Sequence, residues 1–402
     1  MKIPLLISLL IAVLGAQGAA YAQKTHGPGV TDTEIKLGQT MPYSGPASAL
    51  GTAGKAQLAY FAMVNAKGGV KGRKINLLSL DDGYSPPKTV EQTRKLVESD
   101  QVLALFSPLG TATNAAIQKY VNANQVPHLF IASQLMRWAD PEHFPWTLQT
   151  IRPPLQIEGR LFAEYILKAR PNAKIAVLYQ NDDFGKDYLK GLKDRLGDKA
   201  VSMIVAEASY ELTDPTVDSQ IVTLKASGTD TFADFSLPKS GAQAIRRAYD
   251  IGWRPLHFVS FAASSVGTVL RSAGMEKAVG LISSTVAKDP SDPQWAGDAG
   301  VKEYLAWAKQ WFTDGDPEAW DNVLGYSAAQ LMVEVLRRCG DDLTRENLMR
   351  QATSIKDLQL PMMLPGIKIN TGPKDYLSVE QMQLQRFDGE RWVRFGELVG
   401  RP

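Results

Sequence analysis

From Ile35 onward, short apolar runs alternate with amphipathic stretches, and this alternation predicts βα units in mostly parallel sheets. The pattern occurs twice, before and after the proline-containing segment 146–154. Because roughly 380 residues that follow an N-terminal leader exceed what one hydrophobic core usually holds, we predict an α/β chain of two domains. The expected strands cover residues 35–39, 75–82, 102–106, 126–131, 174–179, 201–206, 231–235 and 257–261, with helices near 88–98, 242–249, 301–312 and 328–338 and a hairpin around 388–389.

The N-terminus has the features of a secretory signal peptide. Lys2 precedes an uncharged apolar run from Ile3 to Leu14, and small residues lead to a cleavage site at 20–22. The apolar run is too short to span a bilayer, which takes about 20 residues. Because no cysteine near the cleavage site could accept a lipid, we expect residues 1–22 to be removed and the mature protein to diffuse freely in the periplasm of a Gram-negative cell.

The charge balance argues against a nucleic-acid-binding protein, and the cysteine content excludes an intramolecular disulfide. Removing Lys2 from the 44 Lys and Arg residues leaves 43 against 42 Asp and Glu, a mature formal charge of +1. That balance gives no electrostatic basis for binding nucleic acid. The single cysteine, Cys339, has no partner for an intramolecular disulfide, and its place in an apolar helical stretch predicts a buried small hydrophobe.

The sequence lacks the common signatures of catalysis and of cofactor binding. It contains no G-x-S-x-G elbow, H-E-x-x-H motif, Walker A loop or G-x-G-x-x-G fingerprint, and its four histidines are scattered. Acidic pairs at 81–82, 182–183 and 341–342 follow strands or precede helices, where carboxylates cap helix N-termini; binding of a divalent cation is the alternative. We therefore expect neither an enzyme nor a bound cofactor.

The segment 102–133 predicts an anion-binding site at the edge of a sheet. Two apolar strands flank a helix that begins near Thr111, where its hydroxyl and the unpaired N–H groups of the first turn converge. The second strand ends in Ala132 and Ser133, and neighbouring parallel strands that end together form the crevice in which open α/β sheets bind ligands. Ordinary helix capping by Thr111 and an ordinary loop serine at position 133 are the alternative.

Five blocks of the sequence resemble one family in the same order: IKLGQTMPYSGPASALG, DDGYSPPKTVEQTRKLVE, LGTATN, YQNDDFGKDYLKGLK and RRAYDIGW. The chain is similar to the Leu/Ile/Val-binding family of type I periplasmic binding proteins, which are solute-binding proteins of ABC importers. The resemblance implies two Rossmann-like lobes, joined by three crossovers, that close on a ligand like a Venus flytrap. We expect lobe 1 to comprise 32–149 plus 284–377, and lobe 2 to comprise 150–283 plus 378–402. The implied partners are an ABC permease and separate ATPase subunits, and the implied state is a monomer.

The carboxylate site of the family corresponds to the residues already named from the strand ends. Thr111 falls where a serine hydroxyl holds the ligand carboxylate, and Ala132 and Ser133 fall where a backbone carbonyl and a second hydroxyl complete that site. Leu50 takes a position where an aromatic side chain lines the pocket, and Phe184 matches the aromatic that closes over the ligand from lobe 2.

Two positions on lobe 2 depart from the amino-acid binders of the family. Ser236 stands where they have a tyrosine, and the loop after the strand HFVS reads Phe261-Ala262 where they place a glutamate against the ligand's ammonium. A buried ammonium without a partner would cost several kcal/mol. Asp234, two residues before Ser236 on the same strand face, is the acid that could substitute.

These departures predict a small carboxylate ligand without an amine, namely an aromatic or phenylpropanoid monocarboxylate. The aromatic side chains that could pack on its ring, with a lobe core or the surface as the alternative for each, are Phe184, Phe261, Tyr43, Tyr84 and Trp138. Three other interpretations stay open: a branched-chain or other amino acid as the ligand, a periplasmic sensor that reports its ligand to a membrane kinase, and an enzyme on the same scaffold.

Overall fold

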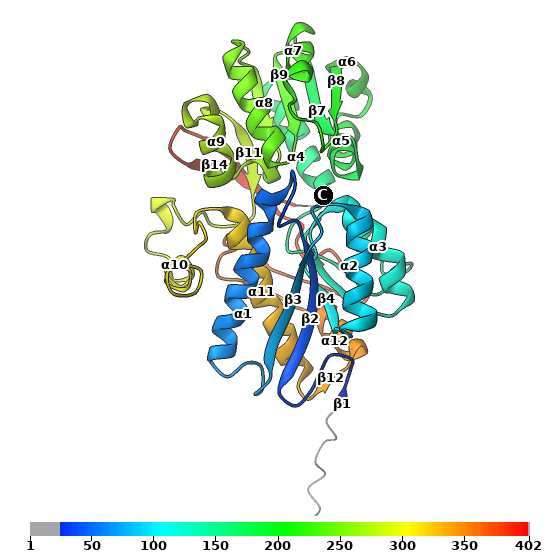
Figure 1. Ribbon diagram of the computed structural model, residues 1–402. Helices are drawn as coiled ribbons and strands as arrows, with labels where there is room; N and C mark the ends of the chain where they lie inside the picture. The colour runs from blue at the N-terminus through cyan, green and yellow to red at the C-terminus, as the bar shows by residue number, and fades with distance from the viewer. Residues whose placement is uncertain (1–24, 401–402) are drawn as a thin grey trace, which may run out of the picture.

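The computed structural model describes residues 25–400 and places most strands in two large sheets, one in each lobe (Figure 1). The predicted signal peptide, residues 1–22, lies outside the described residues. The sheet of lobe 1 is parallel, with the strand order β3-β2-β4-β5-β6. Its strands are β2 (Glu34–Met41), β3 (Lys74–Asp81), β4 (Ala104–Phe106), β5 (His128–Ile131) and β6 (Thr147–Gln149).

The sheet of lobe 2 has the order β14-β13-β11-β10-β9-β7-β8 and becomes antiparallel at the β13 and β14 edge. Its strands are β7 (Ile175–Gln180), β8 (Ile204–Tyr210), β9 (Thr231–Phe235), β10 (Leu256–Val259), β11 (Ile282–Thr285), β13 (Met382–Phe387) and β14 (Trp392–Val399). The predicted hairpin is confirmed, because β13 and β14 pair across Gly389, which has a φ of 113°. A short parallel pair joins β1 (Thr25–His26) to β12 (Asp342–Leu343).

Helices cover the faces of both sheets (Figure 1). Lobe 1 carries α1 (Thr52–Ala66), α2 (Pro86–Arg94), α3 (Thr111–Ala123), α10 (Ala299–Trp311), α11 (Trp320–Cys339) and α12 (Arg345–Ala352). Lobe 2 carries α4 (Leu155–Ala169), α5 (Asp183–Leu196), α6 (Ala200–Met203), α7 (Asp218–Ala226), α8 (Pro238–Asp250) and α9 (Arg271–Ala273). Within residues 25–400, no helix has both the length and the apolar content that crossing a bilayer requires.

The chain crosses between the lobes three times: after β6, after β11 and before β13. The hydroxyl of Ser378 donates a hydrogen bond to the carbonyl of Thr150, which ties the first crossing to the third. The two α/β lobes and their three connections confirm the predicted fold class. The residue limits of the lobes stay a prediction, and the limit at 283/284 falls inside β11.

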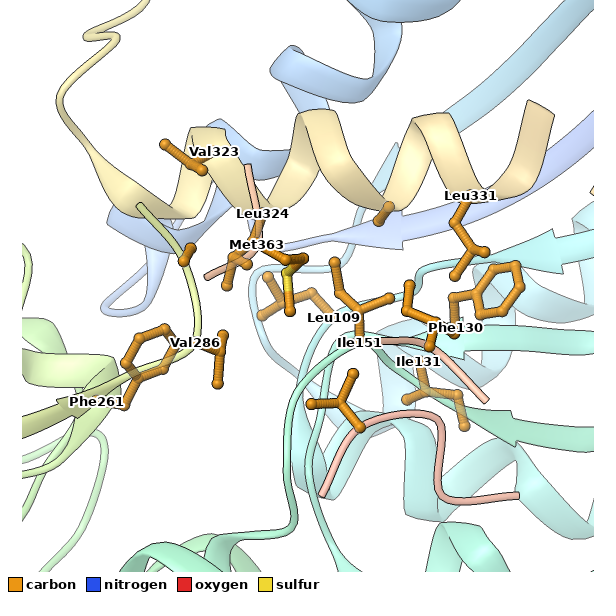
Figure 2. Packing of buried hydrophobic residues seen from close by; sticks show 14 of the residues in the cluster. Leu109, Phe130, Ile131, Ile151, Phe261, Val286, Val323, Leu324, Leu331 and Met363 are labelled. Carbon is orange, nitrogen blue, oxygen red and sulfur yellow. The ribbon is translucent and has the colours of Figure 1, made fainter. Parts of the chain in front are cut away.

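One apolar cluster runs from lobe 1 through the crossings into lobe 2. In Figure 2, Leu324 of α11 lies near Leu109 and Ile151, while Phe261 and Val286 approach from the side of lobe 2. Removing this surface from water is the main favourable term in folding. The crossings are therefore part of a packed core, and their position is coupled to the packing of both lobes.

Two local predictions were wrong. Residues 201–203 belong to helix α6, and strand β8 begins only at Ile204. The side chain of Val201 is 92% exposed and Ser202 is also exposed, so only Met203 of these three residues is buried, as suits one turn of a surface helix. Strand β6 was not expected, because it is three residues long and follows no alternation that a longer strand would show.

The single cysteine is buried, as predicted. Cys339 lies in the last turn of α11 and is 5% exposed. Burial raises the pKa of its thiol to about 12, so the side chain stays protonated at neutral pH. It therefore contributes packing, as a small hydrophobic group would.

Helices α4 and α5 pack in direct backbone contact, which glycine permits. A Cβ atom on Gly191 would lie 2.3 Å from the carbonyl oxygen of Gln156. We expect Gly191→Ala to push the helices apart and to lower the free energy of unfolding by about 1–3 kcal/mol. Urea denaturation measures the change, with Gly297→Ala as the control because a Cβ there meets nothing within 4 Å. Equal unfolding midpoints for Gly191→Ala and the wild type would contradict this packing.

Candidate functional site

The predicted anion site forms where β4 and β5 end and α3 begins. Leu109 pairs with Ala132, and the amide of Gly110 donates to the Ala132 carbonyl at 3.3 Å, which joins the two strand ends. Gly110 has a φ of +115°, and a Cβ at this position would lie 2.4 Å from Thr113 Oγ1. Only glycine fits this turn, and the turn sets Thr111 at the first position of α3.

Predicted site residues meet here in one hydrogen-bonded network, which we call the seat: Thr111, Ala132, Ser133, Tyr84 and Trp138. Thr111 Oγ1 lies 2.9 Å from Ser133 Oγ, and the indole Nε1 of Trp138 donates to Ser133 Oγ at 3.1 Å. The amide of Thr111 donates to the hydroxyl of Tyr84 at 3.2 Å. Sequence reasoning named Tyr84 and Trp138 only as rings, whereas here their polar atoms contact the two hydroxyl residues.

The seat offers hydrogen-bond donors. The Ser133 and Tyr84 hydroxyl oxygens each accept a hydrogen bond from the protein, so each hydroxyl can still donate its own proton to another group. Burial and the charge of Asp182 raise the pKa of Tyr84, and the phenol therefore keeps its proton at neutral pH. The backbone amide of Tyr84 donates to Asp82 Oδ1 at 2.9 Å, but among the described residues no carboxylate is hydrogen-bonded to the hydroxyl of Thr111, Ser133 or Tyr84. Hydroxyl donors that no carboxylate occupies suit an anionic group of a ligand.

Phe184 lies at the start of α5, the lobe 2 helix that contacts α3 of lobe 1. The carboxylate of Asp182 caps this helix by accepting the Phe184 amide at 3.0 Å. The Phe184 ring is 4% exposed and packs edge-to-face on Tyr188, with 5.2 Å between centroids. The closure of Phe184 over a ligand stays a prediction. Helix α5, which carries Phe184, lies at the interface between the lobes, where such closure would occur.

Asp234 and Ser236 interact with each other and with groups of lobe 2. The hydroxyl of Ser236 donates to the carboxylate of Asp234, and Asp234 Oδ2 lies 3.8 Å from His257 Nε2. Both residues are fully buried. Burial raises the pKa of Asp234, and the contact with His257 opposes that shift. These contacts give no support to Asp234 as a partner for a ligand's ammonium, which stays a prediction from the sequence.

The first loop of lobe 1 supplies the two remaining lobe 1 candidates. Leu50 is buried in the 3-10 turn Ser48–Gly51, and this turn contacts α8 of lobe 2. The hydroxyl of Tyr43 lies 2.6 Å from Ser79 Oγ, so its polar end belongs to the network beside β3 and not to the seat. The structure thus brings Leu50 to the interface between the lobes and leaves Tyr43 within lobe 1.

A buried acid that sequence reasoning missed lies beside Phe261 and the half-buried Ala262. Glu158, in the first turn of α4, accepts the amide of Phe261 at 2.9 Å and the hydroxyl of Ser284 at 2.8 Å, and it also accepts the hydroxyl of Tyr188. Burial raises the pKa of Glu158 to about 7, although these three donors oppose the shift. The sequence could have revealed this buried acid, because Glu158 interrupts the apolar stripe of α4.

A second missed pair lies at the first crossing. Arg152 reaches Asp321, at the start of α11, with 3.7 Å between Nη2 and Oδ1. Burial lowers the pKa of Arg152 to about 10 and raises that of Asp321 to about 6, and each partner opposes the other's shift. The guanidinium lies over the rings of Phe261 and Trp320, 5.5 and 4.7 Å from their centroids. Those two rings contact each other and come from different lobes.

Three of these residues, Arg152, Glu158 and Phe261, line one small enclosed cavity between the lobes. Its walls include Gln134, the residue after Ser133, together with Tyr188 and Phe261 of lobe 2. Arg152 and Glu158 also line it. Gln134 follows Ser133 in the chain, but no residue of the seat itself lines this cavity.

The titration of Glu158 can be measured through the pH dependence of the unfolding free energy. Because its folded-state pKa is about 7 against the usual 4.5, the folded protein holds a proton that the unfolded chain releases. The contribution of this carboxyl to stability therefore falls as the pH rises from 4.5 to 7. Glu158→Gln keeps an acceptor for the amide of Phe261 and removes the titration.

We expect the unfolding free energy of Glu158→Gln, relative to the wild type, to increase between about pH 5 and pH 7.5, by roughly 3 kcal/mol at most. Urea denaturation at several pH values measures this difference, and the subtraction cancels the other titrating groups. Parallel stability curves for the two proteins would contradict the assignment.

Known proteins resemble the chain over nearly its whole described length. Residues 34–390 match the sequence profile of a family described as periplasmic binding protein. Leu/Ile/Val-binding protein homolog 7 from Brucella suis biovar 1 (strain 1330) is 24% identical over 366 residues, which cover 88% of this chain and 86% of that protein.

Solved structures share the fold at low sequence identity. A branched chain amino acid ABC transporter protein from Thermus thermophilus with bound valine is 16% identical, with a TM-score of 0.82 over 92% of this chain and 98% of that one. A fatty acid ABC transporter substrate-binding protein from Thermomonospora curvata is 22% identical, with a TM-score of 0.74 over 94% and 95%. Because the family profile covers residues 34–390, the chain belongs to the periplasmic binding protein family, in the type I group of Leu/Ile/Val-binding proteins.

Proposed function

We propose that the protein is a periplasmic receptor of an ABC importer and captures a small aromatic monocarboxylate between its lobes. Membership of the family supports the role of solute receptor. The predicted signal peptide supports the periplasm as its compartment. An ABC permease and separate ATPase subunits would be its partners, and the sequence signatures of an ATP site are absent from the chain itself.

The observation that carries the proposal is the seat. Thr111, Ser133 and Tyr84 direct hydroxyl groups to the N-terminus of α3, where the helix dipole also favours negative charge. A carboxylate bound there would accept charge-assisted hydrogen bonds worth roughly 1.5–3 kcal/mol each. A neutral or cationic head group of a ligand would form weaker interactions with these hydroxyl donors and with the helix dipole.

The residues around Phe261 support the proposal that the ligand carries an aromatic ring. Position 262 is an alanine, so the loop after β10 itself offers no acid to an ammonium group. The rings of Phe261 and Trp320 meet from opposite lobes. When the lobes open, these rings move apart, and a ligand ring entering between them would gain buried area plus about 0.5–1.5 kcal/mol from ring geometry.

Binding would act by shifting the lobes toward the closed state. A ligand held by the seat in lobe 1 and by the Phe261 ring in lobe 2 contacts both lobes only when they are closed. It therefore binds the closed form better, and that difference in affinity shifts the population. The closed form would be the one that the permease recognises.

A branched-chain amino acid is the second candidate. Glu158 is bonded to the Phe261 amide, so a carboxylate from α4 lies beside the loop in which the amino-acid binders carry theirs. The similarity to Leu/Ile/Val-binding protein homologs from Brucella also favours this ligand class. The two candidates differ in whether the ligand carries an ammonium group.

A ligand screen separates these candidates. The mature protein is unfolded and refolded to remove carried-over solute, and then tested by thermal shift against aromatic acids and the proteinogenic amino acids. A ligand at 100 times its Kd adds ~2.7 kcal/mol of stability, which raises Tm by several degrees. We expect a shift with aromatic acids alone. A shift with Leu, Ile or Val alone would contradict the aromatic ligand and favour the second candidate.

The seat is tested by removing one hydroxyl. We expect Thr111→Ala to weaken binding of the aromatic acid found in the screen by about 10–100-fold, because one charge-assisted hydrogen bond is lost. Thr111→Ser, which keeps the hydroxyl, is the matched control and should stay within a few-fold of the wild type. Isothermal titration calorimetry measures both. Unchanged affinity in Thr111→Ala would exclude the seat as the carboxylate site.

A further inference from the structure

Arg152 has more hydrogen-bonding capacity than the folded chain uses. A guanidinium carries five N–H donors in a planar fork. Within residues 25–400, the Arg152 side chain makes no hydrogen bond, and its ionic contact with Asp321 is 3.7 Å long. The side chain is 13% exposed and lines the enclosed cavity. Its donors are therefore largely shielded from bulk water and have no hydrogen-bond acceptor among the described residues.

The polar groups beside Arg152 are also without hydrogen-bond partners. The indole Nε1 of Trp320 is buried and unbonded, and so are both carboxylate oxygens of Asp321. Glu158, on the wall of the same cavity, instead accepts three hydrogen bonds from the protein. Buried polar groups are normally paired, and leaving them unpaired is costly. The unmet donors and acceptors are thus concentrated around Arg152, at the first crossing.

The chemistry around Arg152 distinguishes between possible ligand groups. Arg152 and Trp320 offer donors, while Asp321 offers an acceptor. A phenolic hydroxyl does both, since its oxygen can accept from Arg152 and its proton can go to Asp321. A second carboxylate would meet the negative charge of Asp321, and the Arg152–Asp321 pair is already neutral as a whole. A neutral group that both donates and accepts fits best.

We propose that Arg152, together with Trp320 and Asp321, binds a hydroxyl on the ligand ring at the end opposite the carboxylate. The solute is then a hydroxylated aromatic acid whose carboxylate occupies the seat and whose ring separates Phe261 from Trp320, which contact each other in this structure. This inference rests on the proposed function and adds the far end of the ligand to it. Arg152 acts as a specificity residue through direct contact with the solute.

The probes are 4-hydroxycinnamate, cinnamate and 4-carboxycinnamate, titrated into the refolded ligand-free protein by calorimetry. We expect the wild type to bind 4-hydroxycinnamate about 10–100-fold more tightly than cinnamate, and 4-carboxycinnamate no more tightly than cinnamate. In Arg152→Met, which keeps the apolar stem, the preference for the hydroxyl should fall to within about threefold. Arg160→Met, which breaks a surface pair with Asp194, is the control and should keep the wild-type preference.

Folding is controlled with a second variant. Arg152→Met leaves Asp321 buried without a counter-charge, which destabilises proteins. The double variant Arg152→Met/Asp321→Asn removes both charges, should keep a cooperative urea unfolding transition, and should bind 4-hydroxycinnamate and cinnamate with affinities within about threefold of each other. A purely structural role for Arg152 would change both affinities together and leave their ratio unchanged.

The outcomes for this inference and for the proposed function differ. If no aromatic acid binds the wild type, the proposed function fails and this inference fails with it. If the acids bind but the wild type does not prefer the hydroxylated one, the inference alone is wrong. The same holds if the preference persists in both Arg152 variants, or if 4-carboxycinnamate binds most tightly.

Discussion

The buried carboxylate of Glu158 is the interaction on which the floor of the cavity depends. It receives hydrogen bonds from Tyr188 on α5, from the Phe261 amide after β10 and from Ser284 on β11. These donors come from three elements that are distant in the sequence. A buried carboxylate is tolerated because all three satisfy it, and the same bonds fix the Phe261 loop relative to α4, the first helix after a crossing.

The seat and the first crossing differ in how well the protein satisfies its own polar groups. At the seat, the polar atoms of Thr111, Ser133, Tyr84 and Trp138 are hydrogen-bonded to one another. At the first crossing, Arg152 lies over the rings of Phe261 and Trp320 and makes one long ionic contact, with Asp321, among the described residues. In the proposed function, a ligand that reaches both places would satisfy polar groups that the protein leaves unsatisfied, and this would couple its binding to closure of the lobes.

Sequence reasoning found the residues whose roles are local. Strand ends, turn glycines and hydroxyls beside a helix start are readable from spacing, and they gave Thr111, Ala132 and Ser133. The partners of these residues were not readable, because the Trp138 and Tyr84 bonds depend on how loops of lobe 1 fold over the strand ends. The same limit applies to strand assignment: Val201 is apolar but exposed, and only the tertiary structure shows that nothing covers it.

Arg152 and Glu158 were missed for different reasons. Glu158 left a signal as an acid within an apolar helical stripe, whereas Arg152 precedes two prolines at a crossing and its partner Asp321 comes from a much later helix.

The contrast between these two residues also bears on the ligand. An ammonium group approaching Glu158 would have to share a carboxylate that already accepts from Tyr188, Ser284 and the Phe261 amide. A hydroxyl approaching Arg152 displaces no existing hydrogen bond, because the guanidinium has none within the described chain. Since a new hydrogen bond favours binding only when it outweighs the bonds that are lost, this contrast supports the proposed neutral hydroxyl beside Arg152 over an amine beside Glu158.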